Sequence, residues 1–344
     1  MSFFPGFTQK SIRTSGGVTI NTVMKGEGEP VLLLHGYPQT MVCWHDIAPK
    51  LAKNYTVVVA DLRGYGDSSK PKGLPDHSNY SKRAMAQDMV DVMSKLGFDK
   101  FHLVGHDRGG RVSHRLAKDH GDRVQTLTVL DISPTLKMFE STNLQFATAY
   151  YHWFQMLQPA PLPEKMLQGI VPFNILGRVG RDELDLSAFD PAAVKAYVRA
   201  FKDPKAIHAS CEDYRAAGTI DLVHDRADRR RKLKMPVLTL WGKQGVVNRL
   251  FDCLNDWKEV ASNVRGKALN CGHFVPEEKP AETLREIRAF IAEHPIKVAK
   301  AKKTAAAKPV KAAKPVKAAK PVKAAKPVKA AKAVKAGKAA KPAK

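Results

Sequence analysis

One segment in the first half of the chain constrains its fold more than any other. The aliphatic run Phe101–Val104 leads into a glycine-flanked turn, GHDRGG at residues 105–110, and apolar residues with helical spacing continue to His120. A strand-to-helix turn this tight requires small residues, because it leaves no room for β-carbons. In enzymes with a G-x-S-x-G turn, the central side chain is lifted clear of the sheet. The sequence therefore predicts that Asp107 is presented there as a nucleophile.

Short aliphatic runs bounded by glycine, proline, asparagine or aspartate recur along the chain, and segments with helical spacing lie between several of them. Such runs are typical of strands buried on both faces, as in a parallel sheet covered by helices. The predicted strands are Val31–Leu34, Thr56–Ala60, Phe101–Val104, Val124–Asp131, Pro236–Trp241 and Val264–Leu269. The predicted helices are Ser81–Leu96, Gly109–His120 and Pro280–His294. These patterns predict the α/β class.

The alternation of strands and helices stops after Ser133-Pro134. From residue 134 to about 232 the sequence shows helices and loops rich in aromatics and proline, and strand character returns at Met235–Trp241. A helical insertion between two strands would cover the carboxyl edge of the sheet, where open α/β sheets bind ligands. We therefore expect a core formed by residues 1–133 and 233–294 and a helical cap at 134–232.

The last fifty residues differ in composition from the rest of the chain. Residues 308–331 repeat Lys-Pro-Val-Lys-Ala-Ala four times, and residues 295–344 hold 17 lysines and no acid. These lysines account for most of the formal charge of +24 and leave +7 on residues 1–294, an excess that requires no nucleic-acid partner. Frequent proline and scarce apolar surface prevent a packed structure. The sequence predicts a disordered cationic tail rich in Lys, Ala and Pro.

Neither the cysteines nor the N-terminus indicates a metal, a disulfide framework or export. The four cysteines show no CxxC pair and no zinc-ligand spacing, which favours free thiols in a reducing compartment. The N-terminus lacks a basic segment followed by an apolar stretch, and no window approaches the roughly 18 apolar residues of a membrane span. We expect a cytoplasmic protein with no cofactor and no membrane contact.

Two backbone N–H groups are candidates for an oxyanion hole. The first predicted strand of the core is followed by His35-Gly36-Tyr37-Pro38, a position from which this kind of fold supplies one such donor, here the Tyr37 N–H. The second comes from the residue after the nucleophile, Arg108. We therefore expect Tyr37 and Arg108 to stabilise negative charge beside Asp107.

A histidine and a second acid complete the predicted triad. His273 follows the last predicted strand, where the chain order of nucleophile, acid and histidine places the base. The loop after the penultimate strand, residues 241–247, contains no carboxylate, whereas Asp131 ends the strand that follows the nucleophile helix. We predict that Asp131 orients His273 and stabilises its charged form.

An aspartate nucleophile changes the class of reaction. A carboxylate is already ionised near neutral pH and attacks an electrophilic carbon directly, which gives an alkyl ester on Asp107. His273 is then needed to take a proton from the water that attacks the ester carbonyl. Epoxides and carbon–halogen bonds are the two substrate classes that fit such an intermediate.

Over residues 1–294 the chain resembles the fluoroacetate (haloacetate) dehalogenases of the α/β-hydrolase superfamily. The residues that carry this resemblance are the turn with both arginines, DRGGR at 107–111, the segment YHWF at 151–154 and EDYR at 212–215. The resemblance implies a mostly parallel eight-stranded sheet flanked by helices, with a helical cap inserted after strand six. It further implies a homodimer that acts on short 2-haloacids without a metal or an organic cofactor.

The resemblance also assigns roles to five side chains. It implies that Arg108 and Arg111 hold the substrate carboxylate, for which a guanidinium fork is well suited. It implies that His152, Trp153 and Tyr214 bind the halide, and three donors would stabilise charge that develops only in the transition state. These assignments favour a haloacid over an epoxide.

Two other functions remain open. An epoxide hydrolase with the same Asp-His-Asp triad shares the turn, but it would use two cap tyrosines, and one of the expected positions holds His152-Trp153. A polyanion or nucleic-acid binder would act through residues 295–344, because clustered lysines bind phosphates without reading sequence. A haloacetate assay without added cofactor separates the dehalogenase from the epoxide hydrolase. Deletion of the tail tests the polyanion binder.

Overall fold

Eight strands form one sheet in the order β1-β2-β4-β3-β5-β6-β7-β8. Strand β2 is antiparallel to both of its neighbours, and every other neighbouring pair is parallel. The strands are β1 (Thr8–Arg13), β2 (Thr19–Lys25), β3 (Pro30–Leu34), β4 (Thr56–Ala60), β5 (Phe101–His106), β6 (Val124–Leu130), β7 (Val237–Gly242) and β8 (Val264–Leu269). The predicted fold class, with its mostly parallel eight-stranded sheet, is confirmed.

The structure, a computed structural model, describes residues 3–180 and 185–297. From residue 298 onward the predicted cationic tail lies outside the described residues. Contacts between residues group 1–297 into one compact unit, which contains the predicted core and the predicted cap. Within the described ranges, no helix is both long enough and apolar enough to cross a membrane.

Strands β3 to β8 coincide with the predicted aliphatic runs, whereas β1 and β2 were not among the strands predicted by position. Strand β1 lies at the edge of the sheet, and five of its six side chains are exposed. Strand β2 buries Asn21 and Thr22, and the Asn21 side chain donates to Asp61 at 2.8 Å. Neither strand therefore carries the aliphatic run that marks a strand buried on both faces.

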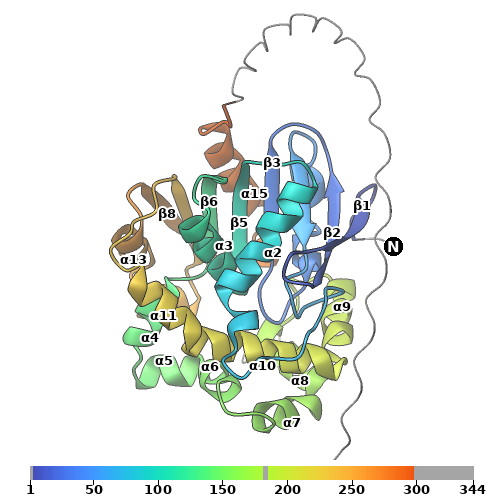
Figure 1. The fold of residues 1–344 in the computed structure, drawn as a ribbon, viewed down its shortest axis with the longest axis vertical. Coiled ribbons are helices and arrows are strands. Elements are labelled where there is room, and N and C mark those ends of the chain that lie inside the picture. Colours follow the sequence, from blue (N-terminus) through green and yellow to red (C-terminus); the bar gives the residue numbers. More distant parts are fainter. Residues whose placement is uncertain (1–2, 181–184, 298–344) are drawn as a thin grey trace, which may run out of the picture. The chain divides into compact units, whose positions relative to one another are not determined.

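Helices cover both faces of the sheet. Figure 1 shows α2 (Lys82–Lys95) and α3 (Arg108–Asp119) in front of the sheet and α15 (Pro280–Ala292) behind it, close to the predicted helices. Helix α2 begins where the Ser81 hydroxyl accepts a hydrogen bond from the Ala84 N–H, and its apolar face is buried. The other core helices are α1 (Ala48–Leu51), α12 (Val246–Leu250), α13 (Cys253–Val260), α14 (Val275–Glu278) and the short 3-10 turns η1 (Met41–Trp44) and η2 (Ser78–Tyr80).

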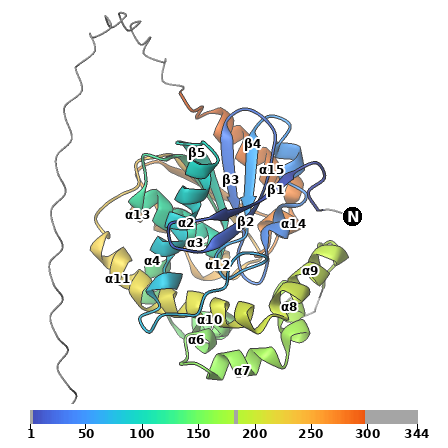
Figure 2. The same cartoon turned by 45° about the vertical axis from the view of Figure 1, so that its right-hand side comes forward.

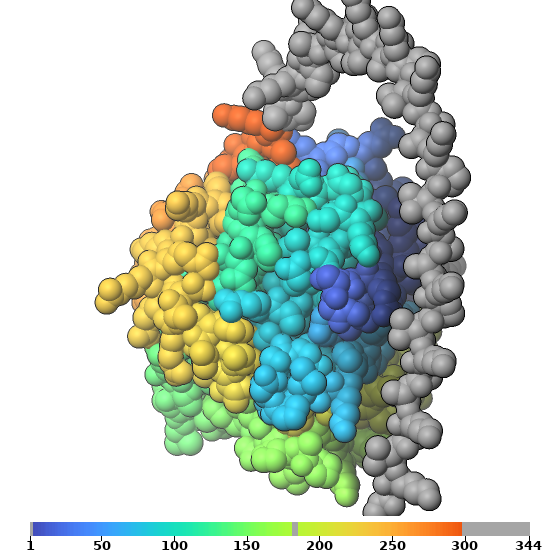
Figure 3. Space-filling model, viewed as in Figure 1, coloured from blue at the N-terminus to red at the C-terminus, as the bar shows by residue number. Residues whose placement is uncertain are grey.

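Between β6 and β7 the described residues form eight successive helices, where the sequence predicts a helical cap. They are α4 (Thr135–Glu140), α5 (Leu144–Ala149), α6 (Tyr151–Met156), α7 (Leu162–Gln168), α8 (Val171–Gly180), α9 (Pro191–Phe201), α10 (Pro204–Gly218) and α11 (Ile220–Ala227). Figures 1 and 2 show them gathered below one end of the sheet. On the face drawn in Figure 3, the yellow and green cap segments abut the cyan segment that leads into α2.

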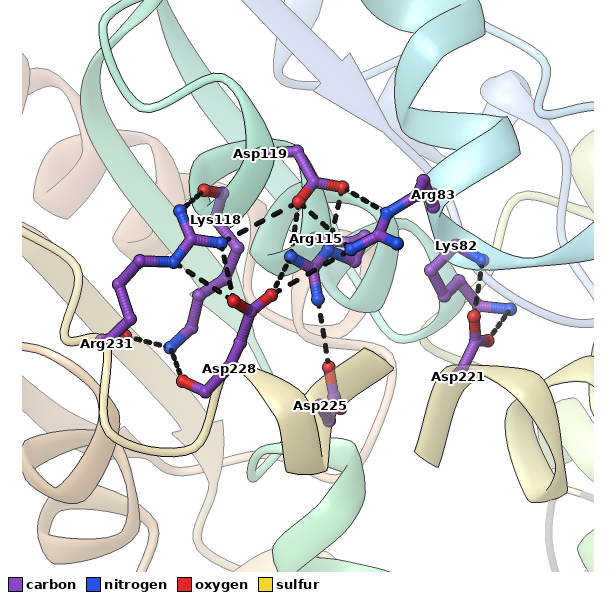
Figure 4. A network of polar contacts seen from close by, with 9 residues as sticks. All are labelled: Lys82, Arg83, Arg115, Lys118, Asp119, Asp221, Asp225, Asp228 and Arg231. Atoms are coloured by element: carbon purple, nitrogen blue, oxygen red, sulfur yellow. Dashed lines mark hydrogen bonds and ion pairs between the residues drawn. The ribbon is translucent and has the colours of Figure 1, made fainter. Parts of the chain in front are cut away.

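A network of charged side chains links the end of the cap to α2 and α3, as Figure 4 shows. Arg115 of α3 is almost fully buried, and it donates to Asp119 and to Asp228, the residue that follows α11. Asp225 of α11 lies 3.6 Å from the same guanidinium. Breaking a buried ion pair is costly because it leaves an uncompensated charge. The network therefore holds α11 against the core.

Candidate active site

Asp107 occupies a sharp turn between β5 and α3. Its backbone has φ 45° and ψ −113°, a conformation that side-chain-bearing residues adopt at a cost and that clusters at functional sites. A β-carbon on Gly105 would lie 2.5 Å from the Gly109 carbonyl oxygen, and one on Gly109 would lie 2.4 Å from that of His35. These two positions therefore exclude larger residues, as the sequence predicts for a tight turn.

The loop after β3 holds one oxygen of the Asp107 carboxylate. The Tyr37 N–H donates to Oδ1 of Asp107 at 2.9 Å. A β-carbon on Gly36 would come within 2.4 Å of the Asp107 β-carbon, so the loop approaches this closely only because Gly36 has no side chain. Arg108 is the first residue of α3, where backbone N–H groups lack partners within the helix and carry a positive potential. Both predicted oxyanion donors thus lie next to Asp107.

The structure brings His273 and Asp131 together. Nδ1 of His273 lies 2.5 Å from Oδ2 of Asp131, whose Oδ1 accepts a second bond from the Gly242 N–H at 2.8 Å. Asp131 follows β6 with φ 49°, so both acids stand in left-handed backbone at the carboxyl ends of neighbouring strands. The other ring nitrogen, Nε2 of His273, lies 3.9 Å from Oδ2 of Asp107. The three side chains predicted to act as nucleophile, base and orienting acid therefore lie close together.

Asp107 is kept ionised in a buried position. Burial alone would raise the pKa of its carboxyl, but the charges of His273, Arg108 and Arg111 outweigh burial and hold the pKa below its ordinary value. Asp107 is 3% exposed. A carboxylate that remains charged while shielded from bulk water is a competent nucleophile.

His106 is a further residue of the site that the sequence analysis did not single out. Its Nε2 lies 2.8 Å from the backbone carbonyl of His273, which can only accept, so this nitrogen carries the proton. Burial, followed by the nearby His273, lowers the pKa of His106 to about 3 and keeps the ring neutral. The only sequence signal that could have placed His106 in the site was its position directly before Asp107 in the turn.

The guanidinium of Arg108 is only partly occupied by protein groups. Its Nε and Nη2 donate to the two carboxylate oxygens of Asp213 at 2.9 and 2.7 Å, and the group lies 4.1 Å from the Tyr214 ring centroid. Its Nη1 is buried without a hydrogen-bond partner among the described residues. Asp213 also accepts from Lys82 of α2 and from the Tyr65 hydroxyl. Arg108 is thus fixed in place with one donor left over.

Arg111 has no acidic partner within ion-pair distance in the part of the chain that the structure describes. Its Nη1 donates to the Thr135 hydroxyl at 3.0 Å, and its guanidinium lies 4.5 Å from the Trp153 ring centroid. Its Nε is buried, with no partner among those residues. Burial, followed by the charge of Arg108, lowers the pKa of Arg111 to about 10, which leaves it charged at neutral pH. A buried cation of this kind suits an anionic ligand.

The three side chains predicted to bind halide lie together on the cap helices α6 and α10. The Tyr214 ring centroid is 5.8 Å from that of His152 and 6.3 Å from that of Trp153. The charge of Asp107 contributes, after burial, to raising the pKa of Tyr214 well above its ordinary value, which places this hydroxyl in the field of the Asp107 carboxylate. The indole Nε1 of Trp153 is buried and has no hydrogen-bond partner among the described residues.

The site is nearly closed to solvent. Arg108, Arg111, Trp153 and Tyr214 are at most 2% exposed, and 20% of the His273 side chain is accessible. A cavity of about 110 Å³ lies elsewhere, between α3, α4, α11 and α13, and none of the predicted site residues line it. Water is thus largely excluded around Asp107, which strengthens the electrostatic interactions there.

One group of side chains in the described ranges has ligand atoms close enough to hold a metal ion. Glu164, His208 and Glu212, on α7 and α10, place these atoms within 4.8 Å of one another. The guanidinium of Arg215 donates to both glutamates at 2.7 Å and offsets part of their charge. This cluster is therefore accounted for as an ion-pair network within the cap.

The chain has clear relatives among known proteins. Residues 29–280 match the family described as alpha/beta hydrolase fold. A fluoroacetate dehalogenase from Burkholderia sp is 47% identical over 297 residues, which span 84% of this chain and 95% of that protein. A soluble epoxide hydrolase from Corynebacterium sp. (strain C12) is 36% identical over 282 residues, 80% of this chain and 94% of that protein.

Solved structures agree with the sequence comparison. The structure of a candidate alpha/beta hydrolase from Nostoc sp PCC 7120 superposes with a TM-score of 0.81 at 53% sequence identity. The superposition covers 84% of this chain and 99% of that one. The fold of the matched part of the chain is therefore similar to that of an experimentally determined structure.

Proposed function

The chain belongs to the alpha/beta hydrolase fold family and is 47% identical to a fluoroacetate dehalogenase, and from this we propose that it hydrolyses the carbon–halogen bond of short 2-haloacids. In the proposed reaction, fluoroacetate and water give glycolate, fluoride and a proton. Asp107 is the nucleophile, and His273 with Asp131 activates the water. The reaction uses neither a metal nor an organic cofactor.

One observation carries this proposal. Three buried N–H donors, Nη1 of Arg108, Nε of Arg111 and Nε1 of Trp153, have no hydrogen-bond partner among the described residues. Buried donors are nearly always paired in folded proteins. Arg111 packs on Trp153, and Arg108 and Trp153 both contact Tyr214, so three unpaired donors on these neighbouring side chains favour a ligand that brings acceptors. A haloacid supplies a carboxylate for the two arginines and a departing halide for the indole. An epoxide has a single oxygen and no charge.

The first chemical step is a displacement at the α-carbon. Oδ2 of Asp107 donates an electron pair to the carbon that bears the halogen, the carbon–halogen bond breaks, and halide leaves with its electron pair. The carboxylate of the substrate, bound to Arg108 and Arg111, aims this carbon at Oδ2. His152, Trp153 and Tyr214 donate hydrogen bonds to the halide as its charge develops.

The second step hydrolyses the ester. His273 Nε2 takes a proton from water, and the oxygen of that water attacks the Asp107 carbonyl carbon. The charge that develops on Oδ1 is held by the N–H groups of Tyr37 and Arg108. Collapse expels glycolate and restores the Asp107 carboxylate, and the imidazolium, stabilised by Asp131, later releases its proton. The 2.9 Å contact from Tyr37 to Oδ1 supports the assignment of Oδ2 as the attacking atom.

The test is a side-by-side assay of halide release from fluoroacetate, chloroacetate and a larger 2-haloacid by the purified full chain without added cofactor. We expect the unaltered chain to release fluoride or chloride, and we expect Asp107→Asn to abolish this release. No release from any haloacid would contradict the proposal.

The second candidate is an epoxide hydrolase, favoured by the 36% identity with the soluble epoxide hydrolase from Corynebacterium. Tyr214 would then protonate the epoxide oxygen. The same enzyme preparation tested with simple epoxides separates the two functions. Diol formation without halide release would replace the first proposal with this one.

A further inference from the structure

An arginine of the cap, Arg178, contacts His152 of the predicted halide site. Arg178 lies on α8, and its Nη1 stands 3.0 Å from Nδ1 of His152 on α6. The guanidinium also lies 4.4 Å from the ring centroid of Tyr151. The sequence analysis did not single out Arg178, because 26 residues separate it from His152 and no motif contains it.

The chemistry of this contact fixes where the His152 proton resides. A guanidinium has only N–H donors and stays protonated in proteins, so Nδ1 of His152 must accept. A neutral imidazole has one acceptor and one donor nitrogen, and therefore Nε2 carries the hydrogen. We propose that Arg178 is a positioning residue that holds His152 in the Nε2–H tautomer, so that this N–H donates to the departing halide; this inference rests on the proposed dehalogenase function.

The surroundings of His152 keep the ring neutral. Burial lowers the pKa of His152 well below its ordinary value, and the charges of Arg178, His273 and Arg108 lower it further. These groups face it from α8, from the loop after β8 and from α3. The rings of Tyr37, Tyr150 and Tyr214 pack around it, at centroid distances between 5.5 and 6.3 Å. Arg178 thus selects between the two neutral tautomers of His152 and does not stabilise a charged ring.

Helix α8 makes a second contact with the site one turn earlier. Asn174 Nδ2 donates to the Tyr37 hydroxyl at 3.0 Å, and the Tyr37 N–H holds Oδ1 of Asp107. Residues 174 and 178 are four apart and therefore lie on the same face of the helix. This face of α8 thereby aligns Arg178 with His152.

Fluoride is a poor leaving group, so a missing donor should slow C–F cleavage more than C–Cl cleavage.

The tautomer is tested directly by nitrogen NMR of the full chain labelled with ¹⁵N-histidine, with His152→Gln used to assign the signal. We expect an unprotonated Nδ1 and a protonated Nε2 in the unaltered chain and in Arg178→Lys, which keeps a donor. Arg178→Met should show a mixture with protonated Nδ1. A protonated Nδ1 in the unaltered chain would overturn the inference. This measurement needs no turnover, so it remains decisive even if no haloacid is a substrate.

Kinetics then test the consequence. We expect Arg178→Met to lower kcat for fluoroacetate about tenfold, which corresponds to about 1.4 kcal/mol, with a smaller loss for chloroacetate and little change in KM. Arg178→Lys should retain most of the activity. The matched control is Arg199→Met, which removes an exposed arginine from α9 and should leave both rates unchanged. Equal losses with both haloacetates, or a change confined to KM, would contradict the positioning role.

Discussion

Glu277 shows at the level of a single residue how burial sets a pKa outside the proposed triad. It is 5% exposed, accepts from the Tyr197 hydroxyl at 2.9 Å and also bonds the Gln39 amide. Burial raises the pKa of Glu277 to about 8 despite these two hydrogen bonds. The folded chain therefore holds this proton up to about pH 8, whereas the unfolded chain releases it near pH 4.3.

The sign of the resulting pH dependence follows from proton linkage. Between about pH 4.3 and 8 the unfolded state binds fewer protons at this residue, so its contribution to stability falls as pH rises and levels off above about pH 8. Glu277→Gln removes this dependence. We expect equal stability at pH 5 and a variant more stable by about 2 to 4 kcal/mol at pH 8, measured by urea unfolding. A difference that stays constant from pH 5 to 8 would contradict this account.

At the scale of elements, most of the fold could be predicted from the sequence. The strands β3 to β8 and the helices α2, α3 and α15 follow hydrophobic runs and spacing, which report burial directly. Strands β1 and β2 carry no such run, because one lies at the edge and the other buries polar side chains. Local pattern cannot find strands whose burial depends on neighbours far along the chain.

The candidate site, like the fold, has parts that could be predicted from the sequence and parts that could not. The turn at Asp107 and the positions of His273 and Asp131 follow from strand ends, which chain order locates. The contacts that fix the arginines cannot be located from strand ends. Asp213 lies 105 residues after Arg108 and meets it only through the packing of α10 on the core. The ion pair of Arg108 and the role of Arg178 therefore required the three-dimensional structure.

Asp213 links three elements, α2, α3 and α10. The carboxylate pairs with Lys82 and Arg108, and these two charges, after the opposing effect of burial, lower its pKa. Asp213→Asn keeps the shape but leaves the buried Arg108 without its counter-ion, whereas Lys82 retains Asp221 at 3.5 Å. We expect a loss of about 3 to 5 kcal/mol in the free energy of unfolding. The control is Asp99→Asn, an exposed acid, and a loss below about 1 kcal/mol in Asp213→Asn would contradict the linkage.

At the scale of the whole molecule, charge and chemistry are separated along the chain. Residues 295–344 carry 17 lysines, whereas the residues proposed to act on the substrate all lie within 37–273. Deletion of residues 298–344 should leave halide release unchanged and should abolish retardation of DNA in a gel at low salt, because phosphate binding by lysines is electrostatic. A truncated chain that retards DNA equally well would place the polyanion contact in the folded unit.

The central claim is that Asp107 becomes covalently attached to the substrate, and trapping the ester tests it most directly. His273→Asn removes the base needed for hydrolysis but leaves the nucleophile and the arginines in place. After incubation with fluoroacetate and digestion, mass spectrometry should find the mass of one carboxymethyl group on the peptide that contains Asp107. That mass on a different peptide, or no added mass although the unaltered chain releases fluoride, would contradict the account.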